Sequence, residues 1–285
     1  MAVWRGLGFA ALVLLGVLVA ALRTMEARHL KPVIAELHLP PAFAVARDFD
    51  FGRYRLSWRG QAFRVHPQGR PEKVLWGAAG GFLAAGVGRA EGGSRWREGE
   101  LRDRRDLLCR EQSLEAFERL GSQLLLKGHL RCADGSLSSY ALTLQDDGER
   151  GLVLSVTLGE PRLNRLYLAW HREPDERFFG FGERSGGYDL SGRRLAIAGA
   201  GSRQLATAEE GGGATLGFYF TSRLRAFYSQ SAAYQVFDLR DGQRVGLEVH
   251  AGRLLARIYN GDSQDVLLAL QASVVGALPT TPGPK

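Results

Sequence analysis

The pattern of apolar and polar residues changes several times along the chain, and each pattern predicts a different element. Residues 6–22 are apolar and carry no charge. Residues 54–67 alternate apolar and polar positions around a glycine, which predicts a β-hairpin. Between residues 123 and 174, four short apolar runs are separated by Asp-Gly or Gly-Glu-Pro turns. This spacing predicts an antiparallel meander.

A second set of short alternating runs, within residues 214–261, repeats the meander pattern. Two such sets predict a β-sandwich. The glycine-rich stretch 77–93 and the polar run that follows it to Arg105 lack this regularity. We expect a poorly specified loop or edge region there.

One helix is expected near the C-terminus, in the sequence SQDVLLALQASVV. Asp262 is the expected N-cap, and Asp265 lies in the first turn, where a carboxylate favours the positive helix end. Gly276, followed by a proline, ends the helix. The apolar stripe expected to pack on the sheet consists of Leu267, Leu270 and Val274.

These elements predict a mainly-β chain, with an antiparallel β-sandwich, a short C-terminal helix and an N-terminal transmembrane helix. The expected organisation is a transmembrane anchor or uncleaved signal segment at 1–25, a proline-containing connector at 26–45, the β-sandwich domain at 46–262, and a closing helix with the start of a linker at 263–285.

The uncharged segment 6–22 predicts an association with a membrane. Its seventeen residues are slightly fewer than the roughly 20 that span a bilayer, and more than the roughly 7 to 15 of a signal-peptide core. We expect an uncleaved single-pass anchor. Small residues at 19–21 leave signal cleavage open, with export to a periplasm or secretion as the alternative. Basic residues lie on both sides, so the orientation stays open.

The net charge of +7 favours nucleic-acid binding only if the basic residues are clustered. Nearly all of the 37 basic residues are arginines, and they are scattered along the chain without a basic block. We therefore expect no nucleic-acid partner.

The residues that most often hold metals or form disulfides are sparse. Cys109 and Cys132 are too few for a disulfide scaffold and lack metal-ligand spacing, so we expect buried or free thiols. If the domain is exported, pairing across neighbouring strands stays open. The six histidines show no two-His metal spacing. We expect no metal and no cofactor.

The densest concentration of unusual residues lies in FFGFGERSGGYDLSGRR, residues 178–194. Its glycines allow a tight loop, which would present Glu183, Arg184, Tyr188 and Asp189, with Arg193 just beyond. We take these five side chains as candidates for substrate binding. From the residues alone, a surface loop whose charges are satisfied locally explains the stretch equally well.

Three ordered motifs resemble the N-terminal domain of glycoside hydrolase family 31. They are PDERFFGFGERSGGYDLSGRRL, GFYFTSRLRAFYSQSAAYQVFDL and GRLLARIYNGDSQDVLLALQASVVGALPTTP, and the match covers residues 121–282. The resemblance implies a galactose-mutarotase-like β-sandwich with the candidate loop near the sugar site. The run 188–193 resembles the sulfoquinovosidase branch of the family.

The same resemblance implies that the family's catalytic (β/α)₈ barrel, with its two aspartates, would begin only beyond Lys285. Glu183 and Asp189 share one loop and have no partner that would give a carboxylic acid a raised pKa, so we expect no catalytic residue in this chain.

The resemblance thus predicts the non-catalytic front part of an α-glucosidase or other α-glycosidase, which serves in carbohydrate binding or active-site completion. Its partner would be an α-glycoside. Two alternatives are a membrane-tethered carbohydrate-binding module and a scaffold for a separately encoded catalytic barrel chain. The segment LAIAGAGSR departs from the family pattern, and so do Gln264 and Ala277.

Overall fold

The computed structural model describes residues 31–91, 102–149, 151–182, 189–197 and 216–276. The expected membrane anchor, at 6–22, lies outside these ranges. Within them, no helix is both long enough and apolar enough to cross a membrane.

Nearly all regular structure in the described residues is antiparallel β-sheet. The strands of the large sheet follow the spatial order β13 (Phe178–Gly180), β15 (Phe218–Thr221), β16 (Arg225–Ser229), β19 (Arg253–Asn260), β11 (Gly151–Leu158), β10 (Leu137–Asp146), β9 (Gln123–Cys132), β7 (Arg102–Ser113), β6 (Leu83–Glu91), β12 (Arg165–His171), β18 (Arg244–Val249), β17 (Gln235–Asp238) and β14 (Arg194–Ile197). At its margin, β1 (Glu36–His38) pairs with β7 and β8 (Ala116–Leu120) pairs with β9.

A smaller sheet consists of β2 (Arg47–Phe51), β3 (Tyr54–Trp58), β4 (Ala62–Pro67) and β5 (Trp76–Ala79), and a 3₁₀ turn at Pro41–Phe43 precedes it. The predicted hairpin at 54–67 is confirmed as β3 and β4. The expected mainly-β, antiparallel class is confirmed as well.

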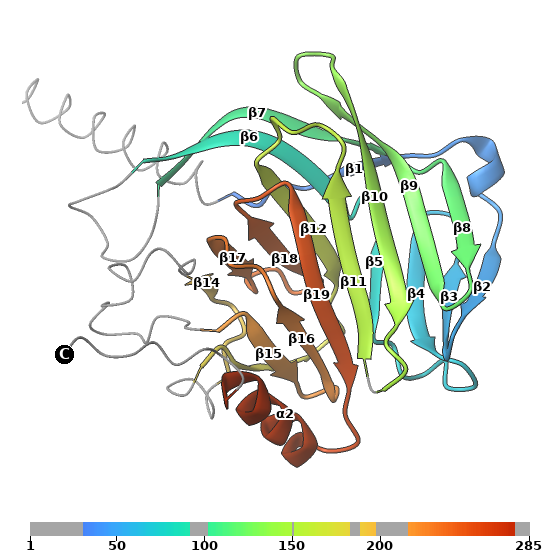
Figure 1. Ribbon diagram of the computed structural model, residues 1–285, viewed down its shortest axis with the longest axis vertical. Coiled ribbons are helices and arrows are strands. Elements are labelled where there is room, and N and C mark those ends of the chain that lie inside the picture. Colours follow the sequence, from blue (N-terminus) through green and yellow to red (C-terminus); the bar gives the residue numbers. More distant parts are fainter. Residues whose placement is uncertain (1–30, 92–101, 150, 183–188, 198–215, 277–285) are drawn as a thin grey trace, which may run out of the picture.

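The large sheet curls so that its two halves face each other across an aromatic core (Figure 1). Trp170 on β12 stacks on Phe227 of β16 with ring centroids 4.9 Å apart, although many strands separate them in the sheet. Tyr219 on β15 similarly meets Phe237 of β17. Each large apolar side chain buried in this way contributes about 1.5–3 kcal/mol. Apolar burial therefore closes the two layers.

The predicted meander over 123–174 is correct for three of its four strands. β9, β10 and β11 pair in succession, and their alternating burial matches the alternating sequence. The fourth strand, β12, pairs with β6 and β18 instead. Most of its residues are buried whichever way they point, which suits a strand covered on both faces.

The expectation of a loop or edge region at 77–93 is wrong. Within the described part of that stretch lie most of β5 and all of β6, and β6 is an interior strand between β7 and β12. A Cβ on Gly86 would lie 2.6 Å from the Leu107 carbonyl oxygen and 3.6 Å from the Tyr167 ring. The glycines here permit close packing of neighbouring strands, so they do not mark a loop.

The closing helix forms as α2, Gln264–Gly276, and covers β15 (Figure 1). The predicted N-cap, Asp262, is wrong. The Ser263 hydroxyl accepts a hydrogen bond from the backbone N–H of Val266 at 3.3 Å, and a serine oxygen caps as well as an aspartate oxygen does. Leu267 is buried beside Phe218, as the stripe predicted, while nothing is described of the Val274 side chain.

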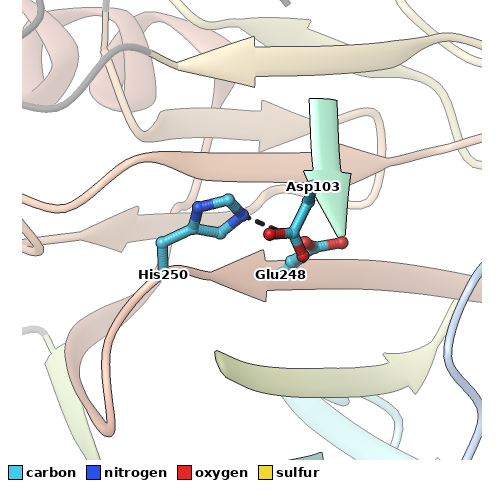
Figure 2. Close-up of side chains that lie close together, drawn as sticks. All are labelled: Asp103, Glu248 and His250. Atoms are coloured by element: carbon cyan, nitrogen blue, oxygen red, sulfur yellow. Dashed lines mark hydrogen bonds and ion pairs between the residues drawn. The ribbon is translucent and has the colours of Figure 1, made fainter. Parts of the chain in front are cut away.

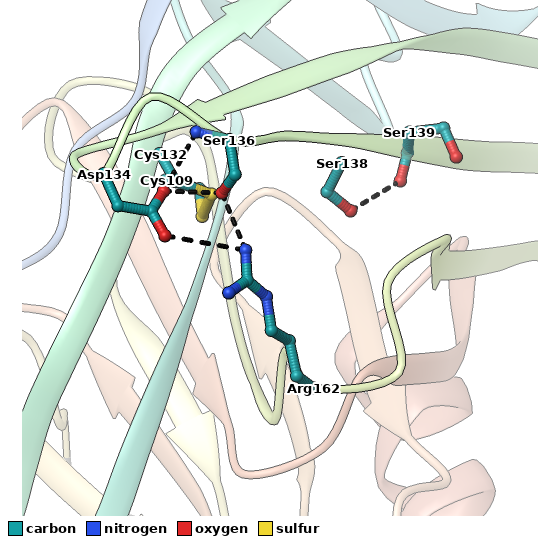
Figure 3. Close-up of a disulfide and its surroundings, with 7 residues drawn as sticks. All are labelled: Cys109, Cys132, Asp134, Ser136, Ser138, Ser139 and Arg162. Carbon is teal, nitrogen blue, oxygen red and sulfur yellow. Dashed lines mark hydrogen bonds and ion pairs between the residues drawn. A yellow bond between two sulfur atoms is a disulfide. The ribbon is translucent and has the colours of Figure 1, made fainter.

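The two cysteines form a disulfide. Cys109 on β7 lies directly opposite Cys132 on β9, and both are buried. Figure 3 shows the bond beside the turn that follows β9, where Asp134 accepts hydrogen bonds from Ser136 and Arg162 approaches from the β11–β12 connection. Among the alternatives left open by the sequence, cross-strand pairing is the one the structure contains.

Replacing both cysteines with alanine is expected to lower the free energy of unfolding by about 3 kcal/mol, because the bridge closes a loop between residues 23 positions apart. Urea denaturation under non-reducing conditions measures the change. Wild type treated with a reductant keeps both sulfur atoms but loses the bond between them. Its stability therefore separates the effect of the disulfide bond from the effect of side-chain packing. Equal stability of reduced and oxidised wild type would contradict the prediction.

Candidate functional site

The candidate loop leaves the large sheet at the end of β13 and returns before β14. Of its candidate residues, Glu183, Arg184 and Tyr188 lie outside the described residues. Asp189 and Arg193 are described, together with both ends of the loop. The geometry therefore defines how the loop is held at its base.

The chain enters the loop through three consecutive residues with positive φ. Gly180, Phe181 and Gly182 have φ values of 112°, 64° and 126°. A Cβ on Gly180 would lie 2.9 Å from the Phe218 carbonyl oxygen, so only glycine fits there. A phenylalanine with a positive φ has a strained backbone, and such strain persists only where the surrounding structure imposes it.

At Phe181, packing stabilises the strained backbone conformation. Its ring is fully buried, stacks on Tyr219 at 5.6 Å and meets Phe237 edge-on at 5.1 Å. Its backbone N–H donates to the Phe218 carbonyl at 2.7 Å. The direction in which the chain enters the candidate loop is therefore fixed by the aromatic core.

At the other end of the loop, Asp189 ties the returning chain to β13. Its Oδ1 accepts hydrogen bonds from the backbone N–H of Phe178 at 3.2 Å and from the backbone and hydroxyl of Ser191 at 2.9 and 2.7 Å. Burial acts to raise the pKa of Asp189, but these hydrogen bonds outweigh it and hold the pKa below its ordinary value. This carboxylate organises the loop end, while the Arg193 side chain is exposed.

A buried ion pair beneath the loop was not predicted from the sequence. Arg225 on β16 donates from Nε to Oε1 of Glu176 at 2.7 Å and from Nη2 to Oε2 at 2.5 Å. The Glu176 side chain is 0% exposed and that of Arg225 is 7% exposed. Burial acts to raise the pKa of Glu176, yet hydrogen bonds from Arg225 and Thr221 and the charge of Arg225 hold that pKa below its ordinary value.

The segment that carries Glu176 is fixed by further hydrogen bonds to its backbone. Arg172 donates to the carbonyl oxygens of Glu176 and Leu239, at 2.8 and 3.1 Å. The Ser191 hydroxyl oxygen, whose one hydrogen is directed mainly to Asp189, also lies 3.4 Å from the Glu176 carbonyl oxygen. The ion pair thus anchors the strand entering the loop and the segment leaving it. The sequence feature that could have indicated this pair is Arg225, a charged residue at the start of the largely apolar strand RAFYS.

A second charged cluster, shown in Figure 2, joins Asp103 of β7 to Glu248 and His250 at the end of β18. Two carboxylates and an imidazole are ligand types that divalent cations use. However, Asp103 is 2.6 Å from Arg165 Nη2, and Glu248 is 3.1 Å from both Arg105 Nη2 and His250 Nε2. Guanidinium groups already neutralise both carboxylates, so we assign the cluster as an ion-pair network between strands.

Close packing around this network explains another glycine of β6. A Cβ on Gly88 would lie 2.9 Å from Arg165 Nε and 3.0 Å from Asp103 Oδ1. The network joins residues far apart in the sequence, so no local spacing motif indicated it.

Replacing Glu176 with glutamine is expected to lower the free energy of unfolding by about 3–5 kcal/mol at pH 7, because it leaves the Arg225 charge buried without a counter-ion. Since folding lowers the pKa of Glu176, the pair's contribution is present above the ordinary value of about 4.5 and is lost as pH falls through the lowered value. The gap between wild type and variant therefore narrows in acid.

Urea denaturation of both proteins between pH 7 and pH 3 measures this gap. Glu149→Gln, at an exposed glutamate, is the matched control and is expected to change stability by less than about 0.5 kcal/mol. A Glu176→Gln variant as stable as this control at pH 7 would show that the pair does not hold the loop base.

Comparisons with known proteins find relatives of similar sequence and of similar fold. No family model matches the chain. A sulfoquinovosidase from Agrobacterium fabrum is 28% identical over 159 residues, which are 50% of this chain and 23% of that protein.

A solved structure, of a family 31 sulfoquinovosidase from E. rectale in complex with an aza-sugar inhibitor, aligns with 83% of this chain and 35% of its own. Its TM-score is 0.54 at 17% identity. The chain thus spans only 23% to 35% of the length of these two relatives. The resemblance predicted from three motifs is confirmed: half of the chain is homologous to a sulfoquinovosidase, and its fold is similar to that of a family 31 sulfoquinovosidase.

Proposed function

We propose that this chain forms the non-catalytic, galactose-mutarotase-like β-sandwich of a family 31-type α-glycosidase and uses its 183–188 loop for carbohydrate binding or active-site completion. The relationship to a sulfoquinovosidase over half the chain supports the family, and the fold likeness supports the domain type. An α-glycoside is the proposed ligand.

The observation that carries this proposal is the rigid base of the loop. Strained Phe181 enters it from a packed aromatic core, and Asp189 closes it with three hydrogen bonds. The buried Glu176–Arg225 pair stabilises the segments on both sides. Loops that bind ligands depend on such rigid support, because ordering a loop at the moment of binding costs free energy.

The state of the carboxyl groups supports a non-catalytic role for the described residues. A retaining glycosidase needs two carboxyl groups about 5–5.5 Å apart, one of them an acid with a raised pKa. Every resolved pKa shift of a described carboxyl group is downward, including those of Glu176, Asp189 and Glu248. Such groups remain ionised at neutral pH and cannot donate a proton to a leaving group.

The disulfide supports the localisation that we propose, with the sandwich on the exported side of a membrane and residues 6–22 as its anchor or as a cleaved signal. Stable disulfides between buried cysteines form in oxidising compartments. Cys109 and Cys132 are both buried, at 0% and 5% exposure, within the sheet.

Two forms of this function remain as competing proposals, namely a self-sufficient carbohydrate-binding module and a partner that completes the active site of a separate barrel chain. They differ in whether the isolated chain binds sugar. A module binds glycans alone, whereas a completing domain binds them only together with its catalytic partner.

The test combines hydrolysis and binding by the purified full chain. We expect no hydrolysis of nitrophenyl α-glycosides above the rate of a denatured sample, and saturable binding to α-linked oligosaccharides on a glycan array. Replacing residues 183–188 with a Gly-Ser segment of equal length is expected to weaken that binding at least tenfold.

The matched control replaces the β9–β10 turn, residues 133–136, with a Gly-Ser segment of equal length; this turn is far from the loop in the sheet order. It is expected to leave glycan binding unchanged. Turnover that the loop replacement abolishes would overturn the non-catalytic proposal. Absence of glycan binding by correctly folded protein would reject the module and favour the completing domain.

A further inference from the structure

An exposed loop without charge lies directly after β1. Residues 39–46 read LPPAFAVA and contain no charged or hydroxyl side chain. All of them except Leu39 and Phe43 are exposed, and Val45 is 58% exposed. Single apolar residues are common on protein surfaces, whereas a continuous exposed apolar run indicates a surface that contacts another apolar phase. We call residues 39–46 the apolar loop.

Packing and hydrogen bonds hold the apolar loop in this exposed position. The backbone N–H of Ala44 donates to the Pro41 carbonyl oxygen at 3.1 Å, within the 3₁₀ turn. The Trp58 indole donates to the Phe43 carbonyl oxygen at 2.6 Å, and the Phe43 ring stacks on Phe117 with centroids 5.7 Å apart. Phe43 therefore packs on the core while its neighbours stay exposed. A loop fixed in this way contacts a partner without the entropy cost of becoming ordered.

The charges beside the apolar loop leave an excess of positive charge. The next two carboxylates in the sequence, Asp48 and Asp50, each lie within 2.7 Å of an arginine guanidinium. Arg47, at the end of the loop, donates to a backbone carbonyl oxygen of the loop at 3.2 Å and has no carboxylate partner among the described residues. The segment 23–35, before the loop, contains three lysines or arginines and one acidic residue. Such a basic rim suits a surface of anionic phosphate headgroups.

The chain itself brings a lipid surface within reach of the apolar loop. Residues 6–22 are the predicted anchor, and β1 begins at Glu36, fourteen residues after Leu22. An extended chain spans at most about 3.3–3.6 Å per residue, so β1 lies within about 50 Å of the end of the anchor. A bilayer that holds the anchor is therefore always close to the loop, whereas a separate protein must first encounter it.

The apolar loop and the base of the proposed sugar loop, residues 183–188, lie on different sides of the molecule. Figure 1 shows residues 31–46, in blue, along the side opposite α2. Helix α2 packs on β15, and β15 pairs with β13, from which the sugar loop leaves. A bilayer against the apolar loop would therefore leave the side of the sugar loop open to soluble glycans.

We propose that the apolar loop is a membrane-contact surface, which lies on a lipid bilayer at the level of the headgroups. Val45 and the exposed prolines and alanines contact the acyl chains beneath the headgroups, while Arg47 stays at the level of the lipid phosphates. The sandwich is thereby held in one orientation, with the base of the sugar loop facing away from the bilayer. This contact rests on the proposed anchor at residues 6–22, but it requires neither glycan binding nor a catalytic partner.

A fluorescent label on the apolar loop tests this contact. Cys109 and Cys132 are bonded to each other and are the only cysteines, so Val45→Cys adds a single thiol for an environment-sensitive nitrobenzoxadiazole label. The full chain is reconstituted into vesicles of phosphatidylcholine and phosphatidylglycerol, with and without lipids that carry a nitroxide on the acyl chain. We expect the emission to shift to shorter wavelength and the nitroxide to quench about half of it.

The matched control carries the same label at Leu268→Cys, an exposed leucine of α2 on the opposite side of the molecule, and is expected to show no quenching. Ala44→Asp, introduced beside the label at residue 45, is expected to lower the quenching to the control value, because burying an unpaired carboxylate is costly. Ala272→Asp, at an exposed position of α2, is expected to leave the quenching unchanged.

Flotation of the vesicles through a density gradient measures anchoring separately. A chain that floats, but whose quenching at residue 45 is absent, equal to that at residue 268 or unaltered by Ala44→Asp, would overturn the contact and leave the anchor intact. A wavelength shift without nitroxide quenching would identify a protein partner, such as a second copy of this chain, and would overturn the contact as well. A chain that does not float would reject the anchor and the contact together.

Discussion

The buried ion pair between Glu176 and Arg225 is the constraint on which the functional end of this sandwich depends. Moving two charges out of water is costly, and their attraction repays that cost only when the geometry is held closely. Here the side chains meet through two hydrogen bonds, and Thr221 and the backbone around Glu176 add further ones. The pair therefore requires β13, β15 and β16 to keep fixed relative positions, and the candidate loop starts from that frame.

Two guanidinium nitrogens of Arg225 bind Glu176 beneath the sugar loop, so this buried cation is already neutralised. Both loop segments next to this pair, at Phe181 and Leu224, contain non-glycine residues with positive φ. Strain at these positions is sustained by the surrounding packing and hydrogen bonds, which is the arrangement commonly found where a protein holds residues ready for a ligand.

Alternation along the chain predicted the strands that are buried on one face, such as β3, β4 and β9 to β11, because their period follows the sheet directly. It failed at β6, because glycines in a sequence usually indicate a loop. Gly86 and Gly88 instead allow neighbouring atoms to approach the strand closely. The Glu176–Arg225 pair escaped prediction because its members are 49 residues apart and only the fold brings them together. Resemblance to a family, rather than periodicity, located the candidate loop.

Hydrogen exchange at the base of the loop tests the central claim most directly. The amide of Phe178 donates to Asp189, that of Leu190 to Phe178, and that of Gly192 to Leu239. If the buried pair and these bonds form one rigid frame, the three amides exchange as slowly as those in the middle of β10, by global rather than local opening. Exchange at these amides many times faster than in β10 under native conditions would contradict the account, because the loop would then lack a fixed base.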